Sequence, residues 1–360
     1  MNDAPSDYSP LNSPAPRSSA ESGSPRATAA VARSPFQILQ ETASAFWLSR
    51  CLHVVADLGV ADVLGDEPAA AAQLAAATGA HAEALQRALR LVASHGIFSQ
   101  DDAGRWSHTP ASRLLRADHP QSVRSYVRML ALPPMWNCAG ALRQAVETGS
   151  PVGKDVVEGG FWNYVANNSE ANTIFNEAMR GKALAQVGAV VERYDFSPFA
   201  RIADIGGGQG HLVQAIVNAT PRAQGVLFDQ PHVVEQAHAI ASDRLVLQGG
   251  NFFTDELPAA DAYILMEVIH DWGDAESDAI LRSVRRAAPA HAKLLLIEAL
   301  IPDDPGPNWI KTLDIIMLDL LGGSQRSSAE YAALLARCGF RLDRKIDVGL
   351  DYWILEASVQ

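Results

Sequence analysis

The chain has 360 residues, of which 48% are hydrophobic, and a mean hydropathy of -0.01, as expected for a globular protein long enough for two domains. Its 29 basic and 41 acidic side chains give a formal net charge of -12, which disfavours nucleic-acid binding. The sequence contains no run of about 18 apolar residues, so no membrane span is predicted. The cysteines, Cys51, Cys138 and Cys338, lie far apart and predict reduced thiols in a cytoplasmic protein.

Residues 1–34 form the first segment and are rich in Pro, Ser and Ala. They contain a single aromatic residue, Tyr8, and no hydrophobic periodicity. Such a composition cannot bury enough apolar surface to offset the entropy lost on ordering. The segment is therefore predicted to be a disordered tail, and the absence of an apolar core region argues against a secretory signal.

Residues 35–185 are predicted to form a mostly helical domain. Apolar residues between 36 and 60 indicate one or two helices, and further helices are expected at 58–64, 74–78 and 83–95. Short strands are expected at 97–98 and 106–109, an order that resembles a winged helix. A DNA-binding regulator is therefore one alternative, but residues 51–120 carry five Arg, no Lys and eight acids, a net charge of 5 − 8 = −3. A DNA-binding protein needs basic side chains to neutralise phosphates, so this alternative is disfavoured.

A glycine-rich turn follows the apolar run Arg201–Ile205, which predicts a buried strand. Gly206, Gly208 and Gly210 then precede a predicted helix, His211–Ala219. Such a turn lets a ligand approach backbone N–H groups at a helix N-terminus. A second predicted strand, 224–228, ends at Asp229, where a carboxylate can accept hydrogen bonds from ribose hydroxyls. The pattern predicts a nucleoside cofactor, and its G-x-G-x-G spacing disfavours an NAD-dependent oxidoreductase, which uses G-x-G-x-x-G.

The remaining strands complete a predicted sheet of seven. A loop at 249–253 follows the third strand, the fourth is expected at Ala262–Ile269, and the fifth at 293–297. The last two are expected at 342–346 and 352–356. Polar side chains follow two of these strands, namely His270-Asp271-Trp272 after the fourth and Glu298 after the fifth. Ligands bind at the carboxyl ends of strands in such sheets, so these residues are candidates for the site.

Several of these segments together resemble the plant-type O-methyltransferases, the caffeic acid and hydroxyindole O-methyltransferase group and its bacterial relatives. The resemblance is carried by Ile269–Trp272, Leu296–Pro302, and Ser328–Tyr331 through Phe340, in addition to the glycine loop, and it covers roughly residues 36–360. It implies an α/β fold: a Rossmann-like, seven-stranded class I methyltransferase domain at 186–360, preceded by a winged-helix-like dimerisation and substrate-lid domain at 35–185.

The resemblance also implies function. The chain is expected to be a homodimeric, metal-independent enzyme that uses S-adenosylmethionine to methylate a hydroxyl of an aromatic natural product. His270 would be the general base, flanked by the carboxylates of Glu298 and Glu330. The cofactor-binding residues would be Gly206, Gly208, Gly210, Asp229, Asn251, Phe252, Met266 and Trp272. The acceptor pocket would be formed by Trp162, Phe175, Met179 and Met317.

The chemistry sets a requirement for the base. A phenol has a pKa of about 10 and a histidine about 6.5, a mismatch of about 3.5 units, so proton removal is expected to be concerted with methyl transfer. The chain also departs from the family at two places. Asn251 replaces the usual loop acid, and the Met266-Glu267 pair replaces the common Lys or Arg before the histidine, so cofactor affinity is the property these changes affect.

Alternatives within the same fold are an N-methyltransferase or a member repurposed for decarboxylation or hydroxylation. The histidine with its two acids argues against both, because an amine acceptor needs no base directed at a phenol.

Overall fold

The computed structural model describes residues 33–349 and 351–360, so the predicted tail, residues 1–34, falls almost entirely outside the described residues. The chain divides into two units, the first ending at Ala45 and the second running from Phe46 to Gln360. Helix α1 spans Pro35–Asp57. No helix within the described ranges combines the length and the apolar character needed to cross a membrane.

The second unit begins with a small helical bundle and a hairpin. Its core is apolar and contains Leu74, Leu89, Phe98 and Trp106. The hairpin pairs β1 and β2 in antiparallel fashion, with Ser99 opposite Ser107, which gives the predicted winged-helix order. The elements are α2 (Val60–Leu64), α3 (Ala71–Thr78), α4 (Ala82–Ala93), β1 (Phe98–Gln100), β2 (Trp106–His108) and α5 (Pro110–Arg113).

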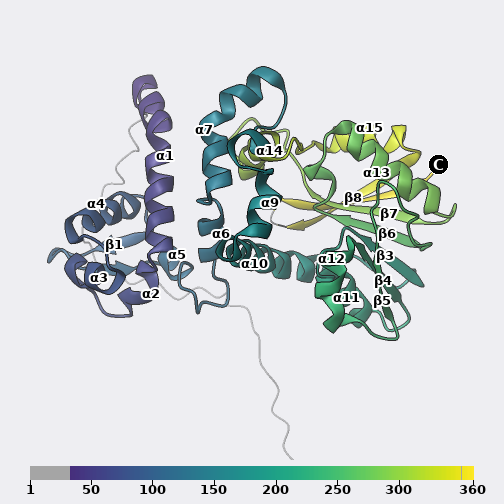
Figure 1. The fold of residues 1–360 in the computed structure, drawn as a ribbon, viewed down its shortest axis with the longest axis horizontal. Helices are drawn as coiled ribbons and strands as arrows, with labels where there is room; N and C mark the ends of the chain where they lie inside the picture. The colour runs from purple at the N-terminus through teal and green to yellow at the C-terminus, as the bar shows by residue number, and fades with distance from the viewer. Residues whose placement is uncertain (1–32, 350) are drawn as a thin grey trace, which may run out of the picture. The chain divides into compact units, whose positions relative to one another are not determined.

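A series of helices leads from this bundle to the sheet (Figure 1). The longest, α10, begins where the Asn168 side chain accepts a hydrogen bond from the Ala171 N–H, and it ends at Arg193. Such an N-cap satisfies one of the free N–H groups of the first turn. The elements are α6 (Arg124–Met129), α7 (Pro133–Thr148), α8 (Gly153–Val156), α9 (Gly160–Asn167) and α10 (Ser169–Arg193).

The rest of the chain forms a seven-stranded sheet in the order β5-β4-β3-β6-β7-β9-β8. The first five are parallel, and the β8–β9 hairpin adds two antiparallel strands beside β7. The strands are β3 (Arg201–Ile205), β4 (Gln224–Asp229), β5 (Leu245–Gly249), β6 (Ala262–Met266), β7 (Lys293–Ala299), β8 (Phe340–Gly349) and β9 (Tyr352–Val359). The helices are α11 (His211–Ala219), α12 (Pro231–Val234), η1 (Glu235–Ile240), η2 (Ile269–Asp271), α13 (Asp274–Ala287), α14 (Trp309–Leu320) and α15 (Ser328–Arg337).

Helices cover both faces of this sheet, as Figure 1 shows. Alternate strand residues such as Ala203, Tyr263 and Leu296 pack against α13 and α15. Their neighbours, such as Ile202 and Ile264, pack against α10 and α11. Because both faces are buried, the strands read as continuous apolar runs, and this made them recognisable in the sequence.

The predicted fourth strand is longer than the strand in the structure. The fourth strand was expected to run to Ile269, but β6 ends at Met266. Glu267 adopts a φ of 54°, in the left-handed region, so the extended backbone cannot continue through it. The next residues turn into the short helix η2, which carries His270.

Candidate active site

The parallel part of the sheet has one point at which its strand order reverses, between β3 and β6. In open α/β sheets, ligands bind outside the carboxyl ends of the strands at such a point. The loop after β3 contains the three predicted glycines, and the segment after β6 contains His270. The topology therefore brings the two strongest sequence signals to one edge of the sheet.

The glycine loop adopts a backbone that requires glycine. Gly206, Gly208 and Gly210 have φ of 71°, 59° and 74°, a region that residues with a Cβ rarely occupy. The Gly206 N–H donates to the Phe228 carbonyl at 2.7 Å, which closes the turn onto β4. Gly210 is also the N-cap residue of α11. The N-terminus of that helix thus faces the proposed ligand site.

Two carboxylates lie beside this loop. Asp229 accepts hydrogen bonds from the N–H groups of Gly208, at 2.8 Å, and Gln230, at 2.6 Å. Asp204 is buried and neither of its carboxylate oxygens has a hydrogen-bond partner within the described structure. Burial, together with the charge of Asp229, raises the pKa of Asp204 to about 7. An orphaned buried carboxyl group and a second acid fit a ligand that carries positive charge and ribose hydroxyls, and they disfavour a pyrophosphate.

An aromatic corner borders the loop on the predicted adenine side. The rings of Phe253 and Trp272 lie 4.9 Å apart and nearly perpendicular, and Phe252 lies 6.0 Å from Trp272. A Cβ built on Gly206 would lie 3.8 Å from the Phe252 ring, so Phe252 is a direct neighbour of the loop. Asn251 uses its amide oxygen to accept the Phe253 N–H at 2.9 Å. The amide therefore shapes this loop, a structural role that the sequence did not predict.

His270 lies buried in η2, three residues after Glu267, which has a left-handed backbone beyond the end of β6. Its Nδ1 is 3.5 Å from Oε2 of Glu298, and its Nε2 is 3.3 Å from Oδ1 of Asp271. The other oxygen of Glu298 accepts the Ile269 N–H at 2.9 Å. The same carboxylate thus fixes the backbone before the histidine and contacts the imidazole, as expected for a residue that orients a base.

The predicted second carboxylate is in a different place. Glu330 accepts hydrogen bonds from the N–H and hydroxyl of Ser327 and so closes a capping box at the start of α15. It is not among the carboxylates within 4.0 Å of the His270 ring in the described residues, which are Asp271 and Glu298. The prediction that Glu330 flanks His270 is therefore wrong, because its carboxylate is committed to the helix cap.

Gln325 occupies the place that Glu330 was expected to fill. Its Nε2 lies 2.9 Å from Nδ1 of His270, and its Oε1 is buried without a hydrogen-bond partner in the described structure. Rotation of an amide by 180° exchanges its oxygen and nitrogen, so the oxygen can accept a hydrogen from Nδ1. The Gln325 N–H also donates to Asp314 of α14 at 2.8 Å, which holds the segment in place. Sequence reasoning missed this residue.

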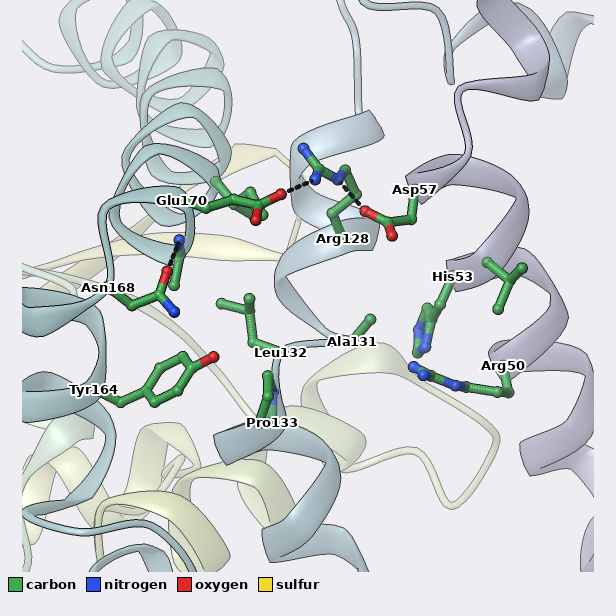
Figure 2. A pocket seen from close by; sticks show the side chains of 13 residues that line it. Arg50, His53, Asp57, Arg128, Ala131, Leu132, Pro133, Tyr164, Asn168 and Glu170 are labelled. Carbon is green, nitrogen blue, oxygen red and sulfur yellow. Dashed lines mark hydrogen bonds and ion pairs between the residues drawn. The ribbon is translucent and has the colours of Figure 1, made fainter. Parts of the chain in front are cut away.

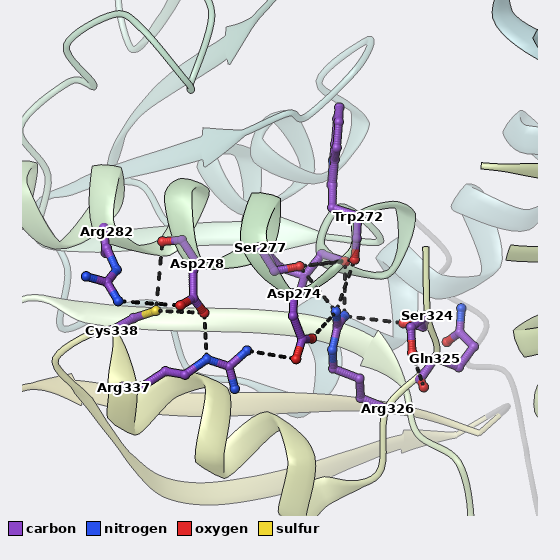
Figure 3. A network of polar contacts seen from close by, with 11 residues as sticks. Trp272, Asp274, Ser277, Asp278, Arg282, Ser324, Gln325, Arg326, Arg337 and Cys338 are labelled. Carbon is purple, nitrogen blue, oxygen red and sulfur yellow. Dashed lines mark hydrogen bonds and ion pairs between the residues drawn. The ribbon is translucent and has the colours of Figure 1, made fainter. Parts of the chain in front are cut away.

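Arg326, in the loop before α15, binds the segment that contains His270 (Figure 3). Its buried guanidinium donates to the Trp272 carbonyl at 3.0 Å, to Asp274 at 2.9 Å and to the Ile269 carbonyl at 3.3 Å. Ser324 donates its N–H to the His270 carbonyl at 2.9 Å. A Cβ on Gly323 would lie 2.1 Å from that same carbonyl, so only glycine allows this approach. These contacts fix the backbone on both sides of His270.

The surroundings make His270 more basic than a free histidine. Burial by itself lowers the pKa of His270, but the charges of Glu298, Asp271 and Glu267 outweigh it and raise the pKa to about 9. Burial raises the pKa of Glu298 to about 7, against the opposing effect of His270. The difference in pKa between a phenol and this histidine is therefore about 1 unit, compared with about 3.5 units for a free histidine. The group is a stronger base, but it must lose its own proton before it can act.

The predicted acceptor residues lie on α9, α10 and α14. The rings of Trp162 and Phe175 are 5.5 Å apart and perpendicular, and Met179 shares an apolar cluster with Phe175. Met317 is buried on α14. Met266, a predicted cofactor residue, ends β6 and packs toward α10 and α11. Helix α9 packs against α10, whereas α14 packs against α7 (Figure 1).

A separate cavity of about 230 Å³ lies between the end of α1 and helices α6, α7, α9 and α10 (Figure 2). Arg50 and His53 border it on one side and Tyr164 on the other. Arg128 bridges Asp57, at 2.8 Å, and Glu170, at 2.9 Å. The lining includes neither His270 nor the glycine loop, so this cavity is not the site described above. Within residues 33–349 and 351–360, no group of three or more His, Cys, Asp or Glu side chains could hold a metal ion.

Together, the sheet order, the glycine loop and the acid at the end of β4 define a class I methyltransferase-type domain. The profile of the O-methyltransferase domain matches residues 140–341, and that of the O-methyltransferase dimerisation domain matches residues 40–118. The chain belongs to this family and is an S-adenosylmethionine-dependent O-methyltransferase.

Several relatives place this result among enzymes of natural-product pathways. The phenazine O-methyltransferase PhzM of Lysobacter antibioticus is 40% identical over 325 residues, covering 89% of this chain and 95% of that protein. The mitomycin biosynthesis 6-O-methyltransferase of Streptomyces lavendulae is 36% identical over 312 residues, covering 84% and 88%. The crystal structure of human N-acetylserotonin methyltransferase in complex with SAM has a TM-score of 0.80 at 26% identity, covering 92% and 99%.

Proposed function

We propose that the chain methylates a hydroxyl group of an aromatic small molecule, with His270 as the general base and Glu298 and Gln325 as the residues that orient it. The observation that carries the proposal is the buried imidazole held between Glu298 and Gln325 at the switch point of the sheet. With Nδ1 oriented by these two residues, Nε2, which lies 3.3 Å from Oδ1 of Asp271, is the nitrogen that would accept the proton. The acceptor oxygen would lie on that side of the ring.

The residues of this site act mainly by orientation and proton transfer. When bound, the cofactor would supply an electrophilic methyl group on a sulfonium, and the glycine loop, Asp229 and the corner formed by Phe252 and Trp272 would hold it. Holding the acceptor in line with that methyl is worth up to about 7–11 kcal/mol. His270 removes the hydroxyl proton as the oxygen attacks, and Glu298 stabilises the resulting imidazolium.

The acceptor is proposed to be a planar aromatic molecule. Trp162, Phe175 and Met179 offer flat and adaptable apolar surface on two neighbouring helices. The names of two relatives specify a phenazine and the mitomycin pathway, which supports a polycyclic acceptor. A panel of hydroxyphenazines, hydroxynaphthoates and their amino counterparts would identify the class.

The proposed assembly is a homodimer. Residues 40–118 match the family's dimerisation domain, and α1 exposes Trp47 at 60% and Phe46 at 49%. Large apolar side chains exposed together on one helix mark an interaction surface. Light scattering should give twice the chain mass, and Trp47→Glu should give the mass of one chain. A dimer that persists in this variant would place the interface elsewhere.

The cofactor assignment predicts selective stabilisation by adenosylhomocysteine. At 100 times its dissociation constant, a ligand that binds only the native state contributes about 2.7 kcal/mol. Thermal unfolding should therefore shift upward with adenosylhomocysteine and remain unchanged with NAD. Asp229→Ala should remove the shift, because its carboxylate holds the Gly208 N–H and would bind the ribose. A shift with NAD alone would overturn the cofactor assignment.

The remaining alternative is an amine acceptor. The 8-amino-8-demethylriboflavin N,N-dimethyltransferase of Streptomyces davaonensis is 34% identical over 300 residues, so this family accommodates nitrogen acceptors. An amine that is already neutral needs no base to expose its lone pair. Turnover of amino but not hydroxy compounds in the panel would favour this alternative.

A further inference from the structure

Glu267, between β6 and the histidine segment, has an unusual backbone. Glu267 and Asp351 are the only described non-glycine residues with a positive φ, and the value at Glu267 is 54°. The left-handed conformation is unfavourable for a residue that carries a Cβ. The Glu267 N–H still donates to the Ile297 carbonyl at 2.9 Å, so the strained residue remains attached to the sheet. Contacts made by the Glu267 side chain must therefore stabilise this backbone conformation.

The carboxylate of Glu267 joins three distant parts of the chain. Its Oε1 accepts a hydrogen bond from the ammonium of Lys182 on α10 and another, at 2.5 Å, from the hydroxyl of Tyr352 on β9. The Lys182 ammonium also lies 5.5 Å from the centre of the Tyr352 ring, within the range of a cation–π contact. We call these three residues the α10 clamp. Only 18% of the Glu267 side chain and 27% of the Lys182 side chain are exposed.

The clamp connects the two halves of the site. Phe175, Met179 and Lys182 are spaced by four and then three residues, so they lie on one face of α10. Glu267 lies three residues before His270 and ends the strand that carries it. The ion pair therefore links the helix of the proposed acceptor wall directly to the segment of the proposed base.

We propose that Lys182 and Glu267 are positioning residues for methyl transfer: the clamp fixes the face of α10 that carries Phe175 and Met179 against the end of β6, and it sets the charge that His270 meets. This inference rests on the proposed function for its purpose, but its tests do not need an acceptor. It also accounts for the replacement of the family's usual Lys or Arg by Met266-Glu267. The cation comes from α10 instead, paired with a carboxylate on the strand.

Several ionisable groups face His270, and Glu267 is one of three acids. Glu298 approaches from β7 and Asp271 from η2, while Arg326 and Tyr331 lie near Glu298 on the side of α15. The charge of Glu267 raises the pKa of His270. Burial raises the pKa of Glu267, but Lys182 and His270 outweigh burial and lower it. Glu267 is therefore ionised at neutral pH, and Lys182 partly offsets its effect on the histidine.

The two halves of the clamp should have opposite electrostatic effects. Glu267→Gln removes an acid and should move the titration of His270 to lower pH. Lys182→Met removes the opposing cation and should move it to higher pH. The double variant removes a neutral pair and should return the titration close to that of the wild-type protein. If the ion pair only held the backbone in place, the two single variants would not move the titration of His270 in opposite directions.

The experiment is NMR of isotope-labelled histidine in the free full-length protein, with the His270 signal assigned by its loss in His270→Ala. Hydrogen exchange along α10 is measured in parallel. All three clamp variants should exchange faster around residues 175–183, including the double variant. Asp343→Asn is the matched control, since the Lys293–Asp343 pair is similarly exposed, at 30% and 18%, but lies at the opposite end of β7. It should change neither readout.

Two results would overturn the proposal. One is a His270 titration that moves in the same direction, or not at all, in both single variants. The other is unchanged exchange in α10 when the clamp is removed. Because neither measurement involves methyl transfer, a clamp that passes both tests survives even if the proposed acceptor chemistry fails.

Discussion

Replacement of His270 by alanine is expected to lower turnover of a phenolic acceptor by about 10²–10⁴-fold at neutral pH, the usual contribution of general acid–base catalysis. Affinity for adenosylhomocysteine should barely change, because the imidazole contacts Glu298, Asp271 and Gln325 rather than the glycine loop. Activity should recover in part near the pKa of the phenol, where the acceptor ionises without help. Steady-state rates against pH and calorimetric titration of adenosylhomocysteine measure these effects.

Glu330→Gln is the matched control for this variant. Its carboxylate caps α15 through Ser327, so its loss should cost stability of about 1 kcal/mol or less and leave the pH profile unchanged. A His270→Ala enzyme with near-normal turnover of a phenol would remove the general-base assignment. The amine-acceptor alternative would then be favoured.

The parallel strands could be predicted from the sequence because each strand is buried on both faces. Arg201–Ile205 and His211–Ala219 have the predicted bounds, and the β7 and β9 segments differ from their predictions only in length. The end of β6 could not be predicted in the same way. Apolar residues continue through Ile269, and the turn depends on a glutamate in a conformation that is held by Lys182 and Tyr352, distant in sequence.

The site was predicted in part for a similar reason. The glycines follow β3, His270 lies just beyond the end of β6, and Glu298 lies near the end of β7, so topology alone brings them to one edge. Glu330 was misplaced although Ser327 and Glu330 match the S-x-x-E pattern of a capping box, a local signal that favours a structural role. Gln325 carries no charge and lies in a loop, and its contact with His270 depends on how the loop before α15 packs on η2.

Glu298→Gln is the second variant with a large expected effect, because it removes the closest buried charge that acts on the base. A base works only when deprotonated, so kcat/KM should rise with pH through the pKa of His270, which lies at about 9. Since the charge of Glu298 raises this pKa, its loss should move the rising limb to lower pH. The plateau should fall, because a less basic imidazole removes the phenolic proton less readily and its imidazolium loses a counter-ion. Glutamine can still accept the Ile269 N–H, which preserves the backbone contact.

Gln325→Glu provides the opposite change at the same nitrogen. A carboxylate 2.9 Å from Nδ1 in place of an amide should raise the pKa of His270 further and move the rising limb to higher pH. Rates measured from pH 6 to about 10 on one hydroxylated acceptor compare the two variants with the wild-type enzyme. Opposite displacements would identify His270 as the titrating base, since both substitutions act on one ring nitrogen. A rising limb that stays in place in both variants would mean that the acceptor, and not His270, controls the pH dependence.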